Sequence, residues 1–152
     1  MTLVMAPINI ARYDQLNMEN QLLQINSVTF SFEDISSVIT SFYGKVSKDK
    51  ILRAPFGTVE DWPQHIGRLT HFWWIRFGGK SYQEGLYNPV QKHFESGFNE
   101  VFLDRWLEIF RDTLIEELNP DQANLWYSIA EGMGLALTHN NDLMIRYHQQ
   151  KK

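Results

Sequence analysis

From residue 31 to residue 139, hydrophobic positions recur at the three- and four-residue spacing of α-helices, in segments separated by capping residues, Pro and Gly. Ser31 and Asp34 resemble a capping box and predict the start of a first helix. The apolar stripe of that helix consists of Ile35, Val38, Ile39, Phe42, Tyr43 and Val46. Asp61, two residues before Pro63, predicts the N-cap of a second helix, and Gly78 predicts its end. One face of this helix carries Trp62, His65, Leu69, Phe72, Trp73 and Arg76.

Three further helices are predicted in the second half of the chain. Asn88 and Pro89 mark the start of a short helix of two turns at most, which includes His93. A long amphipathic helix then extends to about Leu118, and its apolar face consists of Phe102, Leu103, Trp106, Leu107, Phe110 and Leu114. Asn119 caps a last helix, whose face carries Trp126, Ile129, Ala130, Met133 and Leu137. No segment alternates with a period of two for long enough to predict a strand, so the expected fold class is all-α.

The two ends of the chain differ from this regular part. Residues 1–30 are rich in Asn and Gln and are interpreted as an N-terminal extension. A helical pattern within the extension consists of Tyr13, Leu16, Leu22 and Leu23. Residues 140–152 are interpreted as a C-terminal tail, which leaves residues 31–139 as the expected domain.

Composition and charge limit the class of function. The 152-residue chain has a formal net charge of −4 and no cysteine, which leaves no thiol nucleophile and no thiolate metal site. It has no Lys/Arg cluster that would indicate nucleic-acid binding, and no apolar run reaches the roughly 18 residues of a membrane span. Residues 1–12 lack the basic region of a signal peptide. We therefore expect a cytoplasmic protein that binds neither nucleic acid nor membrane.

Aromatic residues make up 14% of the chain, which favours a bulky core or a large flat ligand. Four side chains with polar ring atoms fall on four different predicted helices: Tyr43, His65, His93 and Trp106. Apolar residues on the same faces include Phe42, Leu69, Phe72 and Trp73. Each residue taken singly is most simply a core or rim residue. Together, the two sets suit a planar apolar ligand with a metal at its centre, one imidazole below it and polar donors above it.

Six short motifs around these residues resemble the truncated haemoglobins, and most of all the third group of bacterial truncated globins. The motifs are Phe42-Tyr43-Gly44-Lys45-Val46, Lys48-Asp49 with Pro55-Phe56, Trp62-Pro63-Gln64-His65, Phe72-Trp73, Pro89-Val90-Gln91-Lys92-His93 and Arg105-Trp106-Leu107-Glu108-Ile109-Phe110. They occur in the same order as in the family, and the resemblance extends from about Ile35 to Leu137.

The resemblance implies a two-over-two helical sandwich around haem b (iron protoporphyrin IX), with residues 31–139 as the haem-binding globin domain. It implies that His93 is the proximal iron ligand. Distal hydrogen-bond donors would be Tyr43, His65 and Trp106. Apolar haem contacts would be Phe42, Leu69, Phe72 and Trp73. Such a protein binds oxygen or another diatomic gas, such as nitric oxide or carbon monoxide, and depends on a reductase that the sequence does not identify.

Several alternatives stay open at the level of the sequence. The resemblance also implies peroxidase-like or nitric-oxide dioxygenase-like detoxification of reactive nitrogen and oxygen species, which the sequence does not separate from oxygen binding. His65 is either a distal donor or a sixth iron ligand. Four cations are candidates for the haem propionates: Arg53, Arg76, Lys80 and Lys92. A helical protein-interaction module without a cofactor explains the aromatic stripes equally well, although it does not explain the set of donors.

Overall fold

The computed structural model of the chain describes residues 21–57, 59–89, 92 and 96–150, with side chains described up to residue 139. The described elements, in chain order, are β1 (Leu22–Ile25), β2 (Val28–Ser31), α2 (Phe32–Val46), α3 (Arg53–Phe56), α4 (Trp62–Arg76), α6 (Glu100–Glu117) and α7 (Pro120–Gln150). α7 continues through residues 140–150, which the sequence pattern assigned to a tail. No helix in the described part of the chain is long and apolar enough to cross a membrane.

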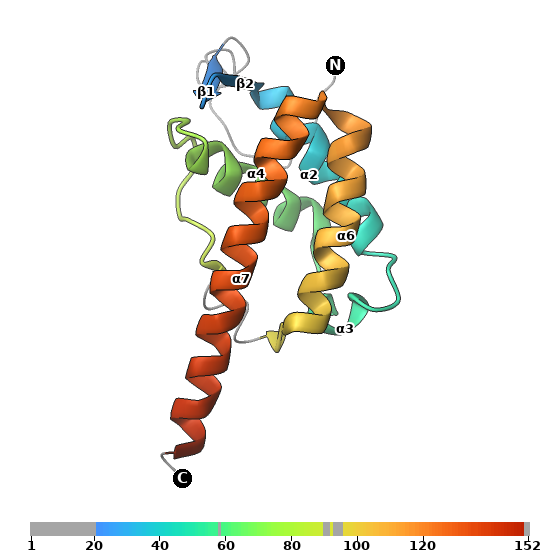
Figure 1. The fold of residues 1–152 in the computed structure, drawn as a ribbon, viewed down its shortest axis with the longest axis vertical. Helices are drawn as coiled ribbons and strands as arrows, with labels where there is room; N and C mark the ends of the chain where they lie inside the picture. Colours follow the sequence, from blue (N-terminus) through green and yellow to red (C-terminus); the bar gives the residue numbers. More distant parts are fainter. Residues whose placement is uncertain (1–20, 58, 90–91, 93–95, 151–152) are drawn as a thin grey trace.

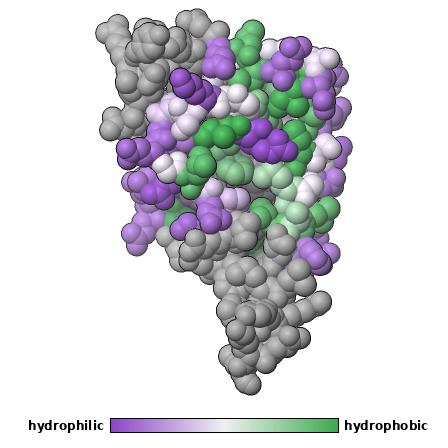
Figure 2. All heavy atoms as spheres, turned by 90° about the vertical axis from the view of Figure 1, so that its left-hand side faces the viewer, coloured by the Kyte–Doolittle hydropathy of each residue, from purple (hydrophilic) through white to green (hydrophobic). Residues whose placement is uncertain are grey.

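The helices form two layers. α2 packs against α4 and α6, and α6 packs against α7. In Figure 1, α6 and α7 lie in front of α2 and α4, and the C-terminal end of α7 projects beyond the other elements. The loop between α4 and α6 lies on the left of that view. Figure 2 shows the molecule from this side, where apolar surface gathers in the middle of the face with polar side chains around it.

The predicted helix starts are confirmed by their capping bonds. Ser31 Oγ accepts from the Asp34 N–H at 3.0 Å, and Asp34 Oδ2 accepts from the Ser31 N–H at 3.0 Å, which completes the capping box. Asp61 Oδ1 accepts from the N–H three residues later at 3.0 Å. Asn119 and Gln122 exchange bonds in the same reciprocal way, at 2.9 and 3.2 Å. These side chains satisfy N–H groups that have no partner within their own helix.

The structure corrects the interpretation of residues 22–31. Leu22 and Leu23, which the sequence pattern placed in a helix, lie in β1, and β1 pairs antiparallel with β2. Tyr13 and Leu16 lie outside the described residues. Each strand has only four residues, so its alternation of polar and apolar positions is too short to be recognised in the sequence. The described fold is therefore helical with one added β-hairpin.

The hairpin is part of the folded body. Its two-residue turn has φ angles of 48° at Asn26 and 70° at the next residue, the left-handed geometry that matches the twist of paired strands. Phe30 is fully buried, stacks on Phe77 with ring centroids 4.9 Å apart, and meets Trp126 edge-on at 5.9 Å. Gln122 Nε2 donates to the β2 carbonyl one residue before Phe30, at 2.7 Å. These contacts attach the hairpin to the first turns of α7.

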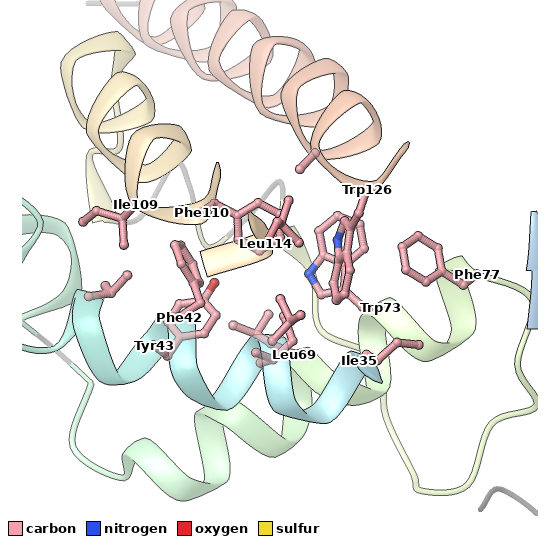
Figure 3. Packing of buried hydrophobic residues seen from close by; sticks show 14 of the residues in the cluster. Ile35, Phe42, Tyr43, Leu69, Trp73, Phe77, Ile109, Phe110, Leu114 and Trp126 are labelled. Atoms are coloured by element: carbon pink, nitrogen blue, oxygen red, sulfur yellow. The ribbon is translucent and has the colours of Figure 1, made fainter. Parts of the chain in front are cut away.

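The core lies between the two layers, where the predicted apolar stripes meet. Figure 3 shows Phe42 of α2, Trp73 of α4, Phe110 of α6 and Trp126 of α7 converging on one region. The Phe110 ring centroid is 4.8 Å from that of Phe42 and 5.6 Å from that of Trp126. Phe42, Phe110 and Trp126 are all fully buried. The helical spacing in the sequence thus identified core faces correctly.

Candidate functional site

An inner cavity of about 70 Å³ lies beside this core. Side chains from α2, α3, α4, α6, α7 and the α4–α6 loop line it. Five of them are site residues expected from the sequence: Tyr43, Leu69, Phe72, Trp73 and Trp106. Met133 and Leu137 of α7 are also in the lining. The helices therefore bring together side chains that are up to 94 positions apart in the sequence (Tyr43 to Leu137).

An outer cavity of about 520 Å³ shares Phe56, Tyr87 and Phe98 with the inner one. This volume lies within the range of roughly 300–1,000 Å³ that is usual for ligand pockets. Its other lining residues are mostly polar or charged, and include His65 and Arg68. The two cavities together form a site that is apolar inside and polar where it opens.

Among the described residues, one expected site residue, Phe42, is not in the lining of either cavity. Phe42 is fully buried and packs edge-on against Tyr43 and Trp106, at 4.7 and 4.8 Å between ring centroids, behind the cavity wall. Phe42 therefore supports the wall from behind, and Tyr43, the next residue of α2, lines the cavity. His93 lies outside the described residues. On either side of it in the sequence, Pro89 and Phe98 line the inner cavity.

Tyr43 and Trp106 lie in the cavity wall and both pack edge-on against Phe42. Tyr43 is 4% exposed, and burial is the largest cause that raises the pKa of its hydroxyl. Nearby Tyr87 raises this pKa further, and the Trp106 indole, which is a donor only, opposes the shift. Tyr43 therefore keeps its proton, which its hydroxyl can donate to a ligand in the cavity.

His65 lies opposite this pair. Its ring meets the ring of Tyr43 edge-on at 5.3 Å, and its Nε2 is buried without a hydrogen-bond partner among the described residues. Burial lowers the pKa of His65 to about 4, and the positive charges of Arg68 and Lys92 act in the same direction. The imidazole is therefore neutral at physiological pH, with a buried nitrogen available to a ligand.

The sequence analysis missed Tyr87, which contributes to both cavities. Its ring centroid is 6.1 Å from those of His65 and Phe72, and burial raises the pKa of its hydroxyl to about 12. Tyr87 lies in a loop without periodicity, so no pattern marks its inward orientation. Only its aromatic type, among Gly and polar neighbours, sets it apart.

The loop that carries Tyr87 is anchored to α4. Trp74 Nε1 donates to the Lys80 carbonyl at 2.9 Å. His71 Nε2 lies 3.2 Å from Ser81 Oγ and 3.4 Å from the backbone nitrogen of Tyr82. Burial lowers the pKa of His71, which favours the neutral imidazole at this anchor. The first part of the loop is thus held in place by polar contacts.

Positive charge at the outer cavity comes from two residues, Arg68 and Lys92. Lys92 is one of the four cations considered from the sequence. The other three, which are all described, do not contribute to the lining of either cavity: Arg53, Arg76 and Lys80. Arg68 was missed because it is exposed on α4 between His65 and Leu69, which the apolar pattern marked. Its position one turn after His65 was the available signal.

Comparisons with known proteins support the fold. No protein-family model and no curated protein sequence matches the chain. Among solved structures, the chain is similar to a group III truncated hemoglobin from Campylobacter jejuni, with 24% sequence identity, a TM-score of 0.60, and coverage of 82% of this chain and 98% of that chain. It is also similar to a thermostable hemoglobin from the actinobacterium Thermobifida fusca, with 24% identity, a TM-score of 0.63, and coverage of 71% and 90%. The helical fold expected from the sequence resemblance is thereby confirmed as a truncated-globin fold.

Proposed function

We propose that this chain binds haem b and, through its iron, oxygen or another diatomic ligand. The observation that carries the proposal is the site itself, in which the polar ring atoms of Tyr43, Trp106 and His65 are set among apolar side chains, and His65 Nε2 has no partner among the described residues. An aromatic core alone has no need of this concentration of polar ring atoms. The truncated-globin fold supports the same conclusion.

The described residues fit a haem group in three respects. Leu69, Phe72 and Trp73 supply apolar surface for a flat ring system. The unpaired Nε2 of His65 is a buried polar atom that lacks a partner among the described residues, which is unusual unless a ligand or water provides one. Arg68 and Lys92 place positive charge at the outer cavity, where it would balance the haem carboxylates.

His93 is the proposed axial ligand. This assignment comes from the sequence resemblance, and the cavity position of Pro89 and Phe98 on either side supports it. A neutral imidazole nitrogen is the usual protein ligand in globins. Haem, held in this way by His93, would supply an iron that can bind a diatomic ligand.

Tyr43 would then retain the ligand. Tyr43 lines the cavity and its raised pKa keeps the hydroxyl protonated, so the proton can be donated into the cavity. A hydrogen bond to a charged or strongly polarised group contributes ~1.5–3 kcal/mol, which corresponds to release that is roughly ten- to a hundred-fold slower. The arrangement favours tight retention over rapid exchange.

His65 has two proposed roles, which differ in one measurable property. As a donor it would assist Tyr43, and as a sixth ligand it would occupy the position of the diatomic molecule. Its neutral state is compatible with both roles. The absorption spectrum of the reduced, ligand-free protein distinguishes them, because two axial imidazoles give sharp low-spin bands. Loss of those bands in His65→Leu would identify His65 as the ligand.

The test of the proposal is the absorption spectrum of the purified full chain and of His93→Ala. We expect a strong Soret band that is lost or weakened in the variant. His139→Ala is the matched control, because His139 is exposed on α7 and its loss is expected to leave the band unchanged. A colourless protein that fails to take up added haem would contradict the proposal and leave a helical interaction module as the better explanation.

A further inference from the structure

The loop between α4 and α6 is attached to α4 at two neighbouring points that differ in their chemistry. At the first point, the Trp74 indole N–H donates to the Lys80 carbonyl at 2.9 Å, and the N–H of Gly79 donates to the Trp74 carbonyl at 2.8 Å. Gly79 lies so close to the Trp74 ring that a Cβ atom there would clash with it. An indole and backbone amides do not titrate near neutral pH, so this first attachment does not depend on protons.

At the second point, the imidazole of His71 holds Ser81 and Tyr82. His71 is 1% exposed, and its Nε2 accepts from the Tyr82 backbone N–H at 3.4 Å. Ser81 Oγ lies 3.2 Å from the same Nε2 and donates its own proton to the Gln83 carbonyl at 3.1 Å. The Tyr82 ring meets the imidazole edge-on at 4.6 Å between centroids. This second attachment therefore depends on a titratable ring nitrogen that accepts a hydrogen bond.

Only the neutral imidazole can accept this bond. A protonated imidazole carries an N–H on both of its nitrogens and offers no acceptor. Nε2–H could then donate to Ser81 Oγ, but the Tyr82 N–H would face a positively charged donor in place of an acceptor. The charge would also be buried, which is unfavourable unless the ring moves toward water. Protonation of His71 therefore removes the bond to Tyr82 and favours separation of the loop from α4.

The surroundings of His71 contain no charge that would hold its proton on or off. Burial is the cause that lowers the pKa of His71 from its ordinary value of 6.5. Among the described residues, the titratable side chain in contact with the ring is Tyr82, against which Phe32 of α2 packs at 5.7 Å. The charged side chains on the surrounding elements that are exposed to solvent are Arg68 and Arg76 on α4, Lys80 and Glu84 in the loop, and Glu33 at the start of α2.

The attached loop leaves one polar group unsatisfied, which makes release possible. The Tyr82 hydroxyl is buried without a hydrogen-bond partner among the described residues, and release would return it to water. Further along the loop, Tyr87 lines both cavities and packs against Phe72 and His65, at 6.1 Å between ring centroids. Phe72 follows His71 in α4, so consecutive residues of one helix contact the start of the loop and the end that forms the cavity wall.

We propose that His71 is a positioning residue that keeps Tyr87 in the cavity wall by holding the loop at Tyr82, and that it does so only as the neutral imidazole. Acid then releases the loop at Tyr82 while Trp74 still holds Lys80, and Tyr87 loses its fixed place beside the two cavities. The effect on a bound haem rests on the proposed function, whereas the attachment and its release are properties of the chain alone.

The test compares the natural chain with two substitutions of His71, each in the full chain as purified. A Gln side chain carries an amide oxygen that accepts hydrogen bonds and is not protonated, so His71→Gln keeps an acceptor at every pH. A Leu side chain has no acceptor, so His71→Leu lacks the bond at every pH. NMR measures the protection of the Tyr82 amide from hydrogen exchange, relative to the intrinsic rate at each pH. It also measures the cross-relaxation between the rings of Tyr87 and Phe72.

In the natural chain, protection of the Tyr82 amide is expected to fall about fivefold as the His71 ring becomes protonated, the factor that corresponds to one hydrogen bond of ordinary strength. The cross-relaxation between Tyr87 and Phe72 should weaken over the same pH range. His71→Gln should keep both signals in acid, and His71→Leu should already show the acid behaviour at neutral pH.

Two controls separate release of the loop from general loosening. The Trp74 indole N–H should stay protected throughout, and His139→Gln, which removes an exposed imidazole of α7, should behave like the natural chain. The proposal is overturned if Tyr82 protection falls equally in His71→Gln, or stays unchanged in the natural chain after His71 has titrated. It is equally overturned if Trp74 loses protection by the same factor, or if the ring cross-relaxation persists after Tyr82 is released. The expected pattern in a chain that takes up no haem would support the role of His71 and contradict the proposed function.

Discussion

The two sides of the cavity are built differently. On the side formed by α2 and α6, the donors are held by their neighbours: Tyr43 and Trp106 both pack edge-on against the buried Phe42, and Arg105, next to Trp106, binds Asp49. On the side formed by α4 and the following loop, His65 Nε2 has no partner among the described residues, and the outer cavity opens beside it. The first side fixes its donors in advance, whereas the second keeps a polar group available.

The difference indicates a division of tasks within one site. Donors that are already oriented lose little freedom when a ligand arrives, so they favour retention. An unpaired group beside an opening can change its position at low cost, so it favours entry and exit. A site with both properties would hold a small ligand tightly and still admit it. The predictions below test this contrast, beginning with the largest expected effect.

Stability should depend on the fixed side far more than on the open side. Phe110 is fully buried and stacks on Trp106 at 4.8 Å between ring centroids. Phe110→Ala is expected to lower the free energy of unfolding by ~3–5 kcal/mol, because it leaves a large cavity in the core. Leu86, on the open side, is 67% exposed, and Leu86→Ala should change this free energy by less than about 0.5 kcal/mol. Urea unfolding measures the free-energy change for both variants. Equal changes would contradict the difference between the two sides.

Ligand retention should also depend on the fixed side, formed by α2 and α6. Tyr43→Phe removes the proposed donor, so oxygen release from the haem-loaded protein is expected to be roughly ten- to a hundred-fold faster. His65→Gln should give a smaller increase, because no hydrogen bond from the described residues to Nε2 holds the imidazole in the donating position. Stopped-flow measurement of the release rate tests both variants. An unchanged rate in Tyr43→Phe would count against the role of the fixed side.

Through His65, the open side should make the free energy of unfolding depend on pH. The pKa of His65 is about 4 in the folded chain, compared with an ordinary value of 6.5, so the unfolded chain binds more protons between these limits. The free energy of unfolding should therefore fall as the pH decreases from about 6.5 to about 4, by at most ~1.4 kcal/mol per pH unit for this group, and level off below.

His71 also has a lowered pKa and contributes in the same direction. We therefore compare the pH dependence of the free energy of unfolding, measured from urea midpoints, between the natural chain and His65→Gln. The difference between the two is the contribution of His65. We expect a shallower fall in the variant. Parallel curves for the two proteins would show that His65 carries no shifted pKa.

The smallest expected effect concerns the charges around the outer cavity. The positive charge of Arg68 is the second largest cause that lowers the pKa of His65. Arg68→Gln should therefore raise this pKa, but only by a few tenths of a unit, since Arg68 is exposed and screened by solvent. NMR titration of the His65 ring measures the shift. Arg76→Gln, at the other end of α4, serves as the control and should leave the pKa unchanged.

Local rules accounted for much of the fold and part of the site. The helix starts at Ser31, Asp61 and Asn119 were predictable because capping is a matter of residues three positions apart. Helical spacing also placed Tyr43 and Trp106 on inward faces, and both line the inner cavity. The packing of Trp106 against Phe42 was not predictable, because it depends on how α2 packs against α6.

The features that were missed have no periodic signal. The hairpin strands are too short to show alternation, although Asn26 is a residue type that tolerates the left-handed turn. Tyr87 is brought to the cavity by a loop whose path depends on bonds to α4. Asp49 and Arg105 both belong to motifs that resemble the family, but they are 56 positions apart and their ion pair was not predicted. Contacts that depend on tertiary packing cannot be predicted from the spacing of residues along the chain.

The docking of the hairpin has a consequence for the order of events during synthesis. The bond from Gln122 to β2 spans 93 positions, and the Phe30 ring packs against Trp126. A chain that emerges from the ribosome N-terminus first presents Phe30 before either of its partners exists. The ring can stack on Phe77 once α4 has been made, but it stays incompletely covered until the start of α7 follows. Folding of this body can be completed only after the last helix emerges, so the earliest described segment is among the last to reach its final place.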